Sequence, residues 1–247
     1  MSHHVHQEIN IAQHPHDIRH KSHRAPYVRA ALMGANDGLV STASFLLGVS
    51  ASGVTQSEMV IIGFTALIAG SLSMFVGEYV SMSSQRDAEK ADIALERRQH
   101  RADGDFELQE LTNIYVQRGL NQQLAQQVAT ELSRNDPLRH HVRDELGIDI
   151  DNLSKPWKAA FASGASFCVG SGIPLVTAIV IPNAMIRMIS IAVVSILTFT
   201  LFGVVSATLG GASKWRACAR IIIFGIFALS LTYLIGMFAR QMFGQSN

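Results

Sequence analysis

The chain has 247 residues, of which 48% are hydrophobic and 16% are charged, and its mean hydropathy is +0.23. This composition is too apolar for an ordinary soluble domain and indicates a membrane protein. The 20 Lys and Arg against 19 Asp and Glu give a net charge of +1, which provides no field to attract nucleic acid or an acidic partner. Cys168 and Cys218 form no Cys-x-x-Cys motif, so neither a disulfide framework nor a thiolate metal site is indicated.

Residues 1–26 form a polar leader with almost no apolar periodicity. We expect this leader to be disordered and to stay in the cytosol, since no small-residue cleavage site of a secretory signal peptide follows the first apolar run. It holds seven of the ten histidines of the chain: His3, His4, His6, His14, His16, His20 and His23. Such a tract can hold metal loosely or serve as a spacer, and the sequence leaves both open.

Residues 27–82 predict a hairpin of two membrane-spanning helices. A spanning helix needs about 20 mostly apolar residues. The segments 27–53 and 58–82 each supply them, and the turn-like residues Ser52-Gly53-Val54-Thr55 separate the two.

Residues 83–156 are charged and Gln-rich, with apolar residues at helical spacing, and predict a soluble helical insert. Ten Lys and Arg against fourteen Asp and Glu give the insert a net charge of −4. Gly104, Gly119 and the pair Asp136-Pro137 divide it into about three helices, because these residues are typical helix stop and start signals.

Residues 157–243 predict three more spans, at 157–181, 184–211 and 221–238, with a basic connector before the last one. The third span of the chain carries small residues and a proline that suit close helix packing: Ser163, Gly164, Gly170, Gly172 and Pro174. The predicted fold is therefore an all-α polytopic membrane protein with five transmembrane helices and a cytosolic helical insert between the second and third.

Positively charged residues near the helix ends predict the orientation, because Lys and Arg concentrate on the cytosolic side. Three segments carry them: Arg19, Lys21, Arg24 and Arg29 before the first span, Arg86 and Lys90 after the second, and Lys214, Arg216 and Arg220 before the fifth. All three lie on one side if the N-terminus and the insert are cytosolic. Arg187 and Arg240 then fall on the opposite side, as exceptions.

Asp37, in the middle of the first span, is the strongest single functional signal. A carboxylate inside a bilayer is costly and usually marks an ion pathway. A helix that starts near Tyr27 places Asp37 roughly 15 Å deep, near the midplane. The alternatives are a hydrogen bond in helix packing or a helix break at Asn36-Asp37-Gly38 whose polar groups satisfy one another.

The second span repeats the combination of thioether and carboxylate. Met74, Glu78 and Met82 follow one another at four-residue intervals and so share one helical face, and Met33 stands one turn before Asp37. Such mixed soft and hard ligands suit a borderline ion such as Fe²⁺, or Mn²⁺ if oxygen ligands dominate. The alternatives are that methionine fills packing gaps and that Glu78 is a solvated interfacial residue.

The insert carries candidate metal ligands on helical faces. Glu96 and His100 are four residues apart, Glu107 and Glu110 are three apart, and Glu145 follows the adjacent His140 and His141, of which at most one can easily join it. Facing helices with inward Glu and His can hold metal, but such charges more often form a solvated face. The Glu-x-x-His pattern of ferritin-like di-iron sites does not occur.

Three motifs resemble the vacuolar iron transporter family, in order and with the expected five spans and insert. Residues 29–41 read Arg-Ala-Ala-Leu-Met-Gly-Ala-Asn-Asp-Gly-Leu-Val-Ser, residues 77–81 read Gly-Glu-Tyr-Val-Ser, and residues 136–138 read Asp-Pro-Leu. The resemblance runs from Tyr27 to the C-terminal end. The 247 residues do not contain the ferritin-like domain that some members carry.

The resemblance implies a homodimer with the ion path between its subunits, proton-coupled export of Fe²⁺ or Mn²⁺ from the cytosol, and a metal-collecting insert. It assigns the membrane aspartate to Asp37 and the second-span methionine to Met74. The insert's glutamates correspond to Glu96, Glu107, Glu110 and Glu145.

The chain departs from the plant-type members of the family at three places. Ala66 stands where those members have a glutamate, Gln99 occupies another glutamate position, and His141-Val142 replaces a methionine pair. Fewer carboxylates with an added imidazole still suit a divalent first-row metal.

The expected function is therefore transport of Fe²⁺ or Mn²⁺ out of the cytosol by proton antiport, without enzymatic activity, organic cofactor or nucleic acid. A buried carboxylate can exchange a proton for a metal ion, because burial raises its pKa and an arriving cation lowers it again. We expect the bacterial cytoplasmic membrane as its site, or a vacuole-type membrane in a eukaryote. The alternatives are a membrane-bound iron oxidase and a non-transporting metal-sensing scaffold, which would leave Asp37 unexplained.

Overall fold

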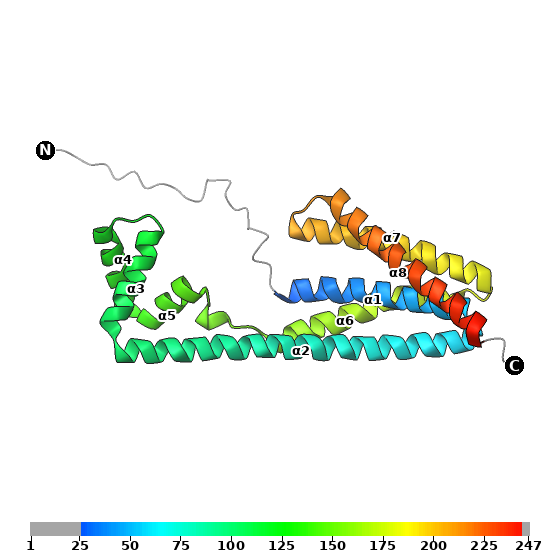
Figure 1. Ribbon diagram of the computed structural model, residues 1–247, viewed down its shortest axis with the longest axis horizontal. Coiled ribbons are helices and arrows are strands. Elements are labelled where there is room, and N and C mark those ends of the chain that lie inside the picture. Colours follow the sequence, from blue (N-terminus) through cyan, green and yellow to red (C-terminus); the bar gives the residue numbers. More distant parts are fainter. Residues whose placement is uncertain (1–25, 244–247) are drawn as a thin grey trace.

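The computed structural model describes residues 26–243, and within this range it contains helices and no strand. The prediction for the leader lies outside the described residues. One end of the molecule is a bundle of long helices, and the other is a smaller group of short helices at the far end of α2 (Figure 1). The long helices are α1 (Pro26–Ala51), α2 (Gln56–Ala102), α6 (Pro156–Val180), α7 (Ala184–Gly210) and α8 (Lys214–Phe243).

The helix α2 joins the two ends of the molecule. It has 47 residues, which correspond to a length of about 70 Å, or more than twice the hydrocarbon core of a bilayer. It begins at a capping box in which Thr55 and Glu58 satisfy each other's backbone N–H groups. The predicted span ends at Met82, but the helix continues to Ala102, because neither Gly nor Pro interrupts residues 83–102. The composition change at Ser83 thus does not mark the end of a helix.

The helices of the insert begin and end near the predicted stop and start signals. Helix α3 (Gly104–Gln117) is capped by the Asp103 side chain, and α4 (Gln122–Asn135) follows a turn in which Gly119 has a φ of +103°. Asp136 caps α5 (Pro137–His141), and a π-helical turn (Val142–Leu146) continues it as far as Gly147. A 3₁₀ turn (Ile150–Asn152) leads back to α6.

Four of the helices among residues 26–243 are long and apolar enough to cross a membrane: α2, α7, α8 and the segment that ends with α6. Helix α1, the fifth predicted span, has 26 residues, which are enough in length, but Asn36 and Asp37 lower its apolar character. Helix α1 lies within the bundle beside α6 and α8 (Figure 1), and we therefore still predict that it is a fifth span.

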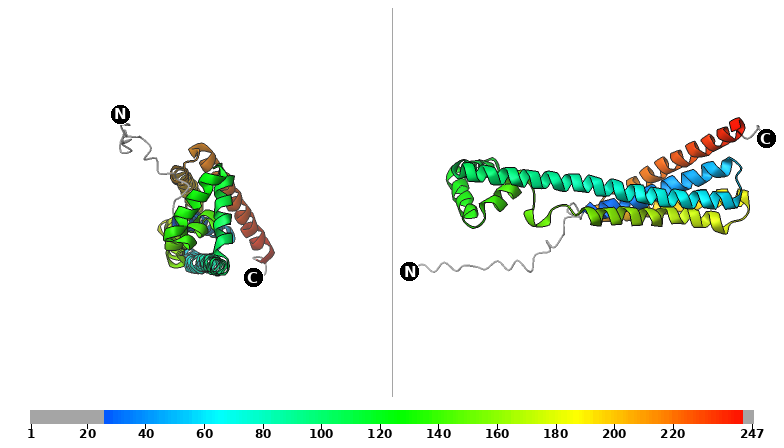
Figure 2. Two further views of the ribbon diagram at one scale, coloured as in Figure 1. Left: turned by 90° about the vertical axis from the view of Figure 1, so that its left-hand side faces the viewer. Right: turned by 90° about the horizontal axis from the view of Figure 1, so that it is seen from below.

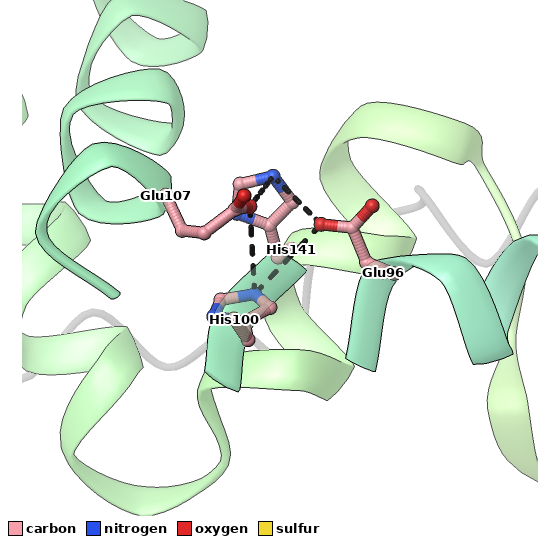
Figure 3. A group of neighbouring side chains, drawn as sticks. All are labelled: Glu96, His100, Glu107 and His141. Atoms are coloured by element: carbon pink, nitrogen blue, oxygen red, sulfur yellow. Dashed lines mark ion pairs between the residues drawn. The ribbon is translucent and has the colours of Figure 1, made fainter. Parts of the chain in front are cut away.

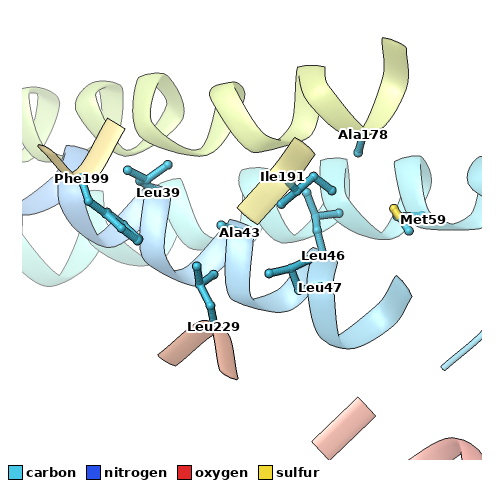
Figure 4. Packing of buried hydrophobic residues seen from close by; sticks show 9 residues of the cluster. All are labelled: Leu39, Ala43, Leu46, Leu47, Met59, Ala178, Ile191, Phe199 and Leu229. Carbon is cyan, nitrogen blue, oxygen red and sulfur yellow. The ribbon is translucent and has the colours of Figure 1, made fainter. Parts of the chain in front are cut away.

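The bundle core lies around the second half of α1. Leu39, Ala43, Leu46 and Leu47 of this helix are buried against residues from four other helices (Figure 4). Those partners are Met59 of α2, Ala178 of α6, Ile191 and Phe199 of α7, and Leu229 of α8. The core therefore holds α1 in the centre of the bundle. It also fixes the position of Asp37, which lies two residues before Leu39 on the same helix.

Close contact between α1 and α6 confirms the predicted small-residue surface. An added Cβ on Gly170 would lie 2.0 Å from the Ala35 carbonyl oxygen, so only glycine allows the two backbones this approach. The Ser171 hydroxyl donates a hydrogen bond of 3.0 Å to the Gly38 carbonyl. Pro174 is also buried inside α6.

Gly170→Ala is expected to destabilise the bundle by about 1–3 kcal/mol, because the new methyl group must push α1 away from α6. Gly172→Ala is the matched control, since nothing lies within 4 Å of a Cβ at Gly172. Thermal unfolding of both variants in the same detergent measures the difference. Equal melting temperatures would contradict the close packing of α1 on α6.

Arg187, one of the two exceptions to the charge rule, is explained by a local role. Its side chain is buried, with 2% of its surface exposed, and donates hydrogen bonds to the carbonyls of Ile181 and Pro182 just beyond the end of α6. The Gln56 side chain donates to further carbonyls at the same helix end. Arg187 thus satisfies orphan carbonyls at the negative end of the α6 dipole.

Candidate metal centre and membrane cavity

Four predicted ligands of the insert converge on one point. Glu96 and His100 come from the last turns of α2, Glu107 from the first turn of α3, and His141 from the end of α5 (Figure 3). One ligand atom from each lies within 4.8 Å of the others. Glu96, Glu107 and His141 have only 5%, 2% and 0% of their surface exposed, so this is not the solvated face that was the alternative.

His141 lies at the centre of this group. Its Nε2 is 3.2 Å from Glu96 Oε1, 3.3 Å from Glu107 Oε2 and 2.9 Å from Glu145 Oε2. His100 Nε2 is farther away, at 3.8 Å and 3.9 Å from the same Glu96 and Glu107 oxygens. Glu110, His141 and Glu145 form a second group of neighbouring ligand atoms. The other five predicted residues of the insert therefore lie around His141, and His140 is not among them.

Several buried atoms in the cluster have no hydrogen-bond partner among the described residues. They are Glu96 Oε1, His100 Nε2, Glu107 Oε2 and both ring nitrogens of His141. Apart from the contacts of 2.9–3.9 Å given above, none of which has the geometry of a hydrogen bond, these atoms are left without polar partners, and native proteins rarely gather several such buried atoms. A divalent cation would satisfy both the carboxylate oxygens and the imidazole nitrogens.

The electrostatics of the cluster fit a site for a cation. Burial, followed by the nearby Glu145, Glu107 and Glu110 carboxylates, raises the pKa of Glu96 from 4.5 to about 7. Burial and the neighbouring His141 lower the pKa of His100, which leaves its imidazole neutral and able to bind metal at neutral pH. The cluster therefore has an excess of negative charge that only protons or cations can neutralise.

The raised pKa of Glu96 predicts a pH dependence of metal binding. Below about pH 7 a proton occupies the carboxylate and competes with the metal, so the apparent Kd for Mn²⁺ is expected to rise about tenfold between pH 8 and pH 6. For the metal-free protein we expect stability to change with pH in the opposite sense to metal affinity. The pKa of Glu96 is higher in the folded than in the unfolded protein, so the free energy of unfolding should decrease as pH rises from about 4.5 to about 7.

Titration calorimetry with Mn²⁺ at several pH values, combined with thermal unfolding of the metal-free protein, tests both trends. Glu96→Gln is the matched variant, because it keeps the shape of the side chain and cannot ionise. An unchanged Kd between pH 8 and pH 6 in the wild-type protein would contradict the role of Glu96 in this competition.

A second network fixes the turn that carries Glu145. Asp144 accepts hydrogen bonds from the Tyr115 hydroxyl at 2.7 Å and from Arg118 Nη1 at 2.6 Å, and Arg118 Nη2 donates to the Asp144 carbonyl. Burial, together with the hydrogen bond to Asp144, raises the pKa of Tyr115 to about 12. Burial alone would raise the pKa of Asp144, but the hydrogen bonds from Arg118 and Tyr115 outweigh it and lower this pKa. Tyr115 and Arg118 lie at the end of α3, the helix that also carries Glu107 and Glu110, so the network ties the two halves of the cluster together.

In the membrane bundle, Asp37 lies in a groove whose walls are α2 and α8. A cavity of about 540 Å³ is lined by Met33 and Asp37 of α1, Met74 of α2, and Arg220 and Phe224 of α8 among other residues. Asp37 and Met74 also line a neighbouring cavity of about 280 Å³. The structure thus brings together three of the five predicted path residues.

Ala66 lies in the smaller of these two cavities, together with Asp37 and Met74. It is the position at which the plant-type members have a glutamate. The position at which the resemblance implies this departure therefore lies beside Asp37.

The other two predicted path residues lie elsewhere. Met82 is buried against Ala30 and Ala159, which fits the packing alternative, and Glu78 is half-buried and does not line either cavity. The shared face of a helix drifts by about 40° for every four residues, so Met82 is turned about 80° away from Met74.

Sequence reasoning missed Arg220 as a lining residue of the Asp37 cavity, and it missed the network of Tyr115, Arg118 and Asp144. Arg220 belongs to the basic segment that was interpreted as a connector, but the structure includes this segment in α8. The network had no signal in the sequence, because Asp144 is 26 positions from Arg118.

Comparisons with known proteins agree with this architecture. The model of the VIT family matches residues 28–237. The chain is 35% identical to a vacuolar iron transporter of Acanthamoeba castellanii over 226 residues, which cover 91% of the chain and 84% of that protein. It is 34% identical to vacuolar iron transporter homolog 2.1 of Arabidopsis thaliana over 89% of the chain and 86% of the relative. It is 37% identical to vacuolar iron transporter homolog 5 of Oryza sativa subsp. japonica, over 85% of the chain and 79% of the relative.

Proposed function

This chain belongs to the VIT family, and from that premise we propose that it moves Fe²⁺, and Mn²⁺ as a second cargo, out of the cytosol in exchange for protons. It is an integral membrane transporter and not an enzyme. The metal ion is cargo in this proposal, first bound by the insert and then passed along the bundle.

The proposal rests on the buried ligand atoms that meet around His141 without forming hydrogen bonds. Two imidazoles and the carboxylates of Glu96 and Glu107 meet there without hydrogen-bond partners among the described residues. Oxygen and imidazole ligands together suit Fe²⁺ and Mn²⁺, and the lack of thiolates disfavours softer ions such as Cu⁺. We therefore propose Glu96, His100, Glu107, Glu110, His141 and Glu145 as the metal ligands of the insert.

The continuous α2 supports a path from the insert to the membrane. Glu96 and His100 of the cluster lie on the same helix as Met74 of the Asp37 cavity, about 33 Å and about 39 Å from it along the helix axis. An ion released from the cluster on the cytosolic side would next meet Glu78 and then Met33, Met74 and Asp37. We propose these four residues as the transport path.

A homodimer is supported by the exposure of the path residues. Asp37 is exposed in the single subunit, and Met33 has 58% of its surface exposed. A carboxylate that faced lipid at this depth would be costly, and a partner subunit over the groove would remove it from lipid and enclose the ion. We propose that two copies pair over the cavity that contains Asp37.

Proton exchange is supported by the chemistry of the carboxylates along the path. A carboxylate in a low-dielectric site can be neutralised by a proton or by a metal ion, but not by both at once. Loading of metal at Asp37 would therefore release a proton, and reprotonation from the other side would release the metal.

Proteoliposomes that contain the purified protein test direction and coupling together. We expect Mn²⁺ added on the side of the insert to enter vesicles that are acidic inside, with loss of the internal acidity measured by a trapped pH dye. Protein-free vesicles and vesicles without a pH gradient are the controls. Metal entry that leaves the internal pH unchanged would refute antiport, and absence of entry would refute transport of Mn²⁺.

A further inference from the structure

A groove on the opposite side of α8 from the Asp37 cavity has no role in the proposed transport. Its inner part, of about 390 Å³, is lined almost entirely by apolar residues of α7 and α8, with Leu47 of α1 as its floor. Its outer part, of about 630 Å³, lies at the end of the bundle away from the insert. Met188 and Tyr233 line both parts, so the two are continuous.

The path of α8 creates this groove. Near its start α8 contacts α7, where the Cys218 thiol donates to the Thr200 carbonyl at 3.5 Å. Toward its end α8 rests on α1 instead, since a Cβ on Gly236 would lie only 2.1 Å from the Gly48 carbonyl oxygen. The end of α8 consequently stands away from the start of α7 (Figure 2, right).

The outer part of the groove is polar where the inner part is not. Arg240, Gln241, Tyr233 and Ser50 are among its lining residues. Arg240 is exposed and has no carboxylate within 4 Å among the described residues, unlike Arg187, whose guanidinium binds carbonyls. Arg240 is also the second exception to the charge rule, and the proposed transport gives it no function.

We propose that this groove holds a glycerophospholipid, with one acyl chain along its inner part and the phosphate at Arg240. From Ala184 to Ile196 the α7 wall extends about 18 Å, which matches one leaflet of a bilayer whose core is about 30 Å thick. An amphiphile of that length places its anionic group at the membrane surface, where the guanidinium lies. Arginine binds phosphate through two parallel hydrogen bonds, which gives the site its preference for this head group.

A second copy of the chain is the competing occupant, and the geometry disfavours it. The groove is lined on α8 by Ile226, Ser230, Tyr233 and Met237, whereas the Asp37 cavity is lined by Arg220 and Phe224 of the same helix. The second wall is α7 in the groove and α2 in the cavity. A partner that covers Asp37 therefore approaches from the other side of α8.

Native mass spectrometry of the delipidated full-length protein tests the site, with phosphatidylglycerol added in one arm and diacylglycerol of the same acyl chains in the other. The wild-type protein is expected to bind one phosphatidylglycerol per subunit at least tenfold more tightly than diacylglycerol. Arg240→Gln should remove this preference. Ser230→Trp, which fills the groove from an exposed position, should weaken both lipids at least tenfold.

Arg216→Gln is the matched control, because Arg216 is an exposed arginine near the other end of α8. It should bind phosphatidylglycerol as the wild type does. Equal binding of the two lipids by the wild type, or unchanged binding by Arg240→Gln and Ser230→Trp, would overturn the proposal. A fall in the dimer fraction of Ser230→Trp without a change in lipid binding would assign the groove to a second copy and overturn it as well.

Discussion

Asp37→Asn is expected to lower the rate of Mn²⁺ entry into proteoliposomes at least about 100-fold, which corresponds to about 2.7 kcal/mol. The asparagine keeps the shape of the side chain and removes the charge that compensates a divalent ion in the cavity shared with Met74. It also removes the group that exchanges metal for a proton in the proposed function. Asp37→Ala should be equally inactive, since both variants lack the carboxylate.

The control for this experiment is Asp105→Asn, which removes an exposed carboxylate from the insert and should transport at the wild-type rate. Metal binding by the insert should be the same in all variants, because Asp37 does not belong to the insert. The dimer fraction is measured as well, because the two copies are proposed to pair over the cavity that contains Asp37. Wild-type flux in Asp37→Asn would remove this residue from the path. Loss of the dimer in the same variant would assign Asp37 a role in subunit pairing.

Glu107→Gln is expected to raise the Kd of the insert for Mn²⁺ about 100-fold, because it replaces a buried anionic ligand by a neutral amide of the same shape. Calorimetric titration of the full-length protein measures this change. Glu131→Gln is the matched control, since Glu131 is an exposed glutamate of α4 whose contact is an ion pair with Arg134. Equal affinities of the two variants would exclude Glu107 from the metal site.

The stability of the same variant distinguishes a ligand from a structural residue. Removal of one of several neighbouring buried carboxylates relieves repulsion, so the metal-free Glu107→Gln protein should melt no lower than the wild type. The rise in melting temperature on addition of Mn²⁺ should shrink, because it follows the affinity. A lower melting temperature without metal would indicate that Glu107 mainly supports the fold.

The sequence predicted the insert residues individually but could not decide between a solvated face and a metal site. Glu96 and Glu107 lie on different helices, and His141 is 34 positions from Glu107. Their meeting depends on the turn at Asp103-Gly104 and on the network that holds Asp144 to α3. Neither the turn angle nor a contact between distant residues follows from helical periodicity.

For the membrane-spanning helices, too, the sequence predicted some features and only the structure showed others. Apolar composition located the long helices, since the cost of unsatisfied backbone in lipid restricts a span to a helix. It did not locate the end of α2, because the helix continues through the change from apolar to charged residues at Ser83. Nor did it place Met82. Each step of four residues rotates the side chain by about 40°, so two steps from Met74 turn Met82 away from the Asp37 cavity, and it is buried against Ala30 and Ala159.

By itself the sequence determined the membrane class, the separation of insert from bundle, and the cost that makes Asp37 a candidate functional residue, because these depend on composition and on local chemistry. Tertiary structure alone decided that five residues of the insert surround His141, that Asp37 shares a cavity with Met74 and Arg220, and that α8 opens a groove beside α7. These features arise where helices from distant parts of the chain meet, and close backbone contacts such as that of Gly236 with Gly48 set their angles.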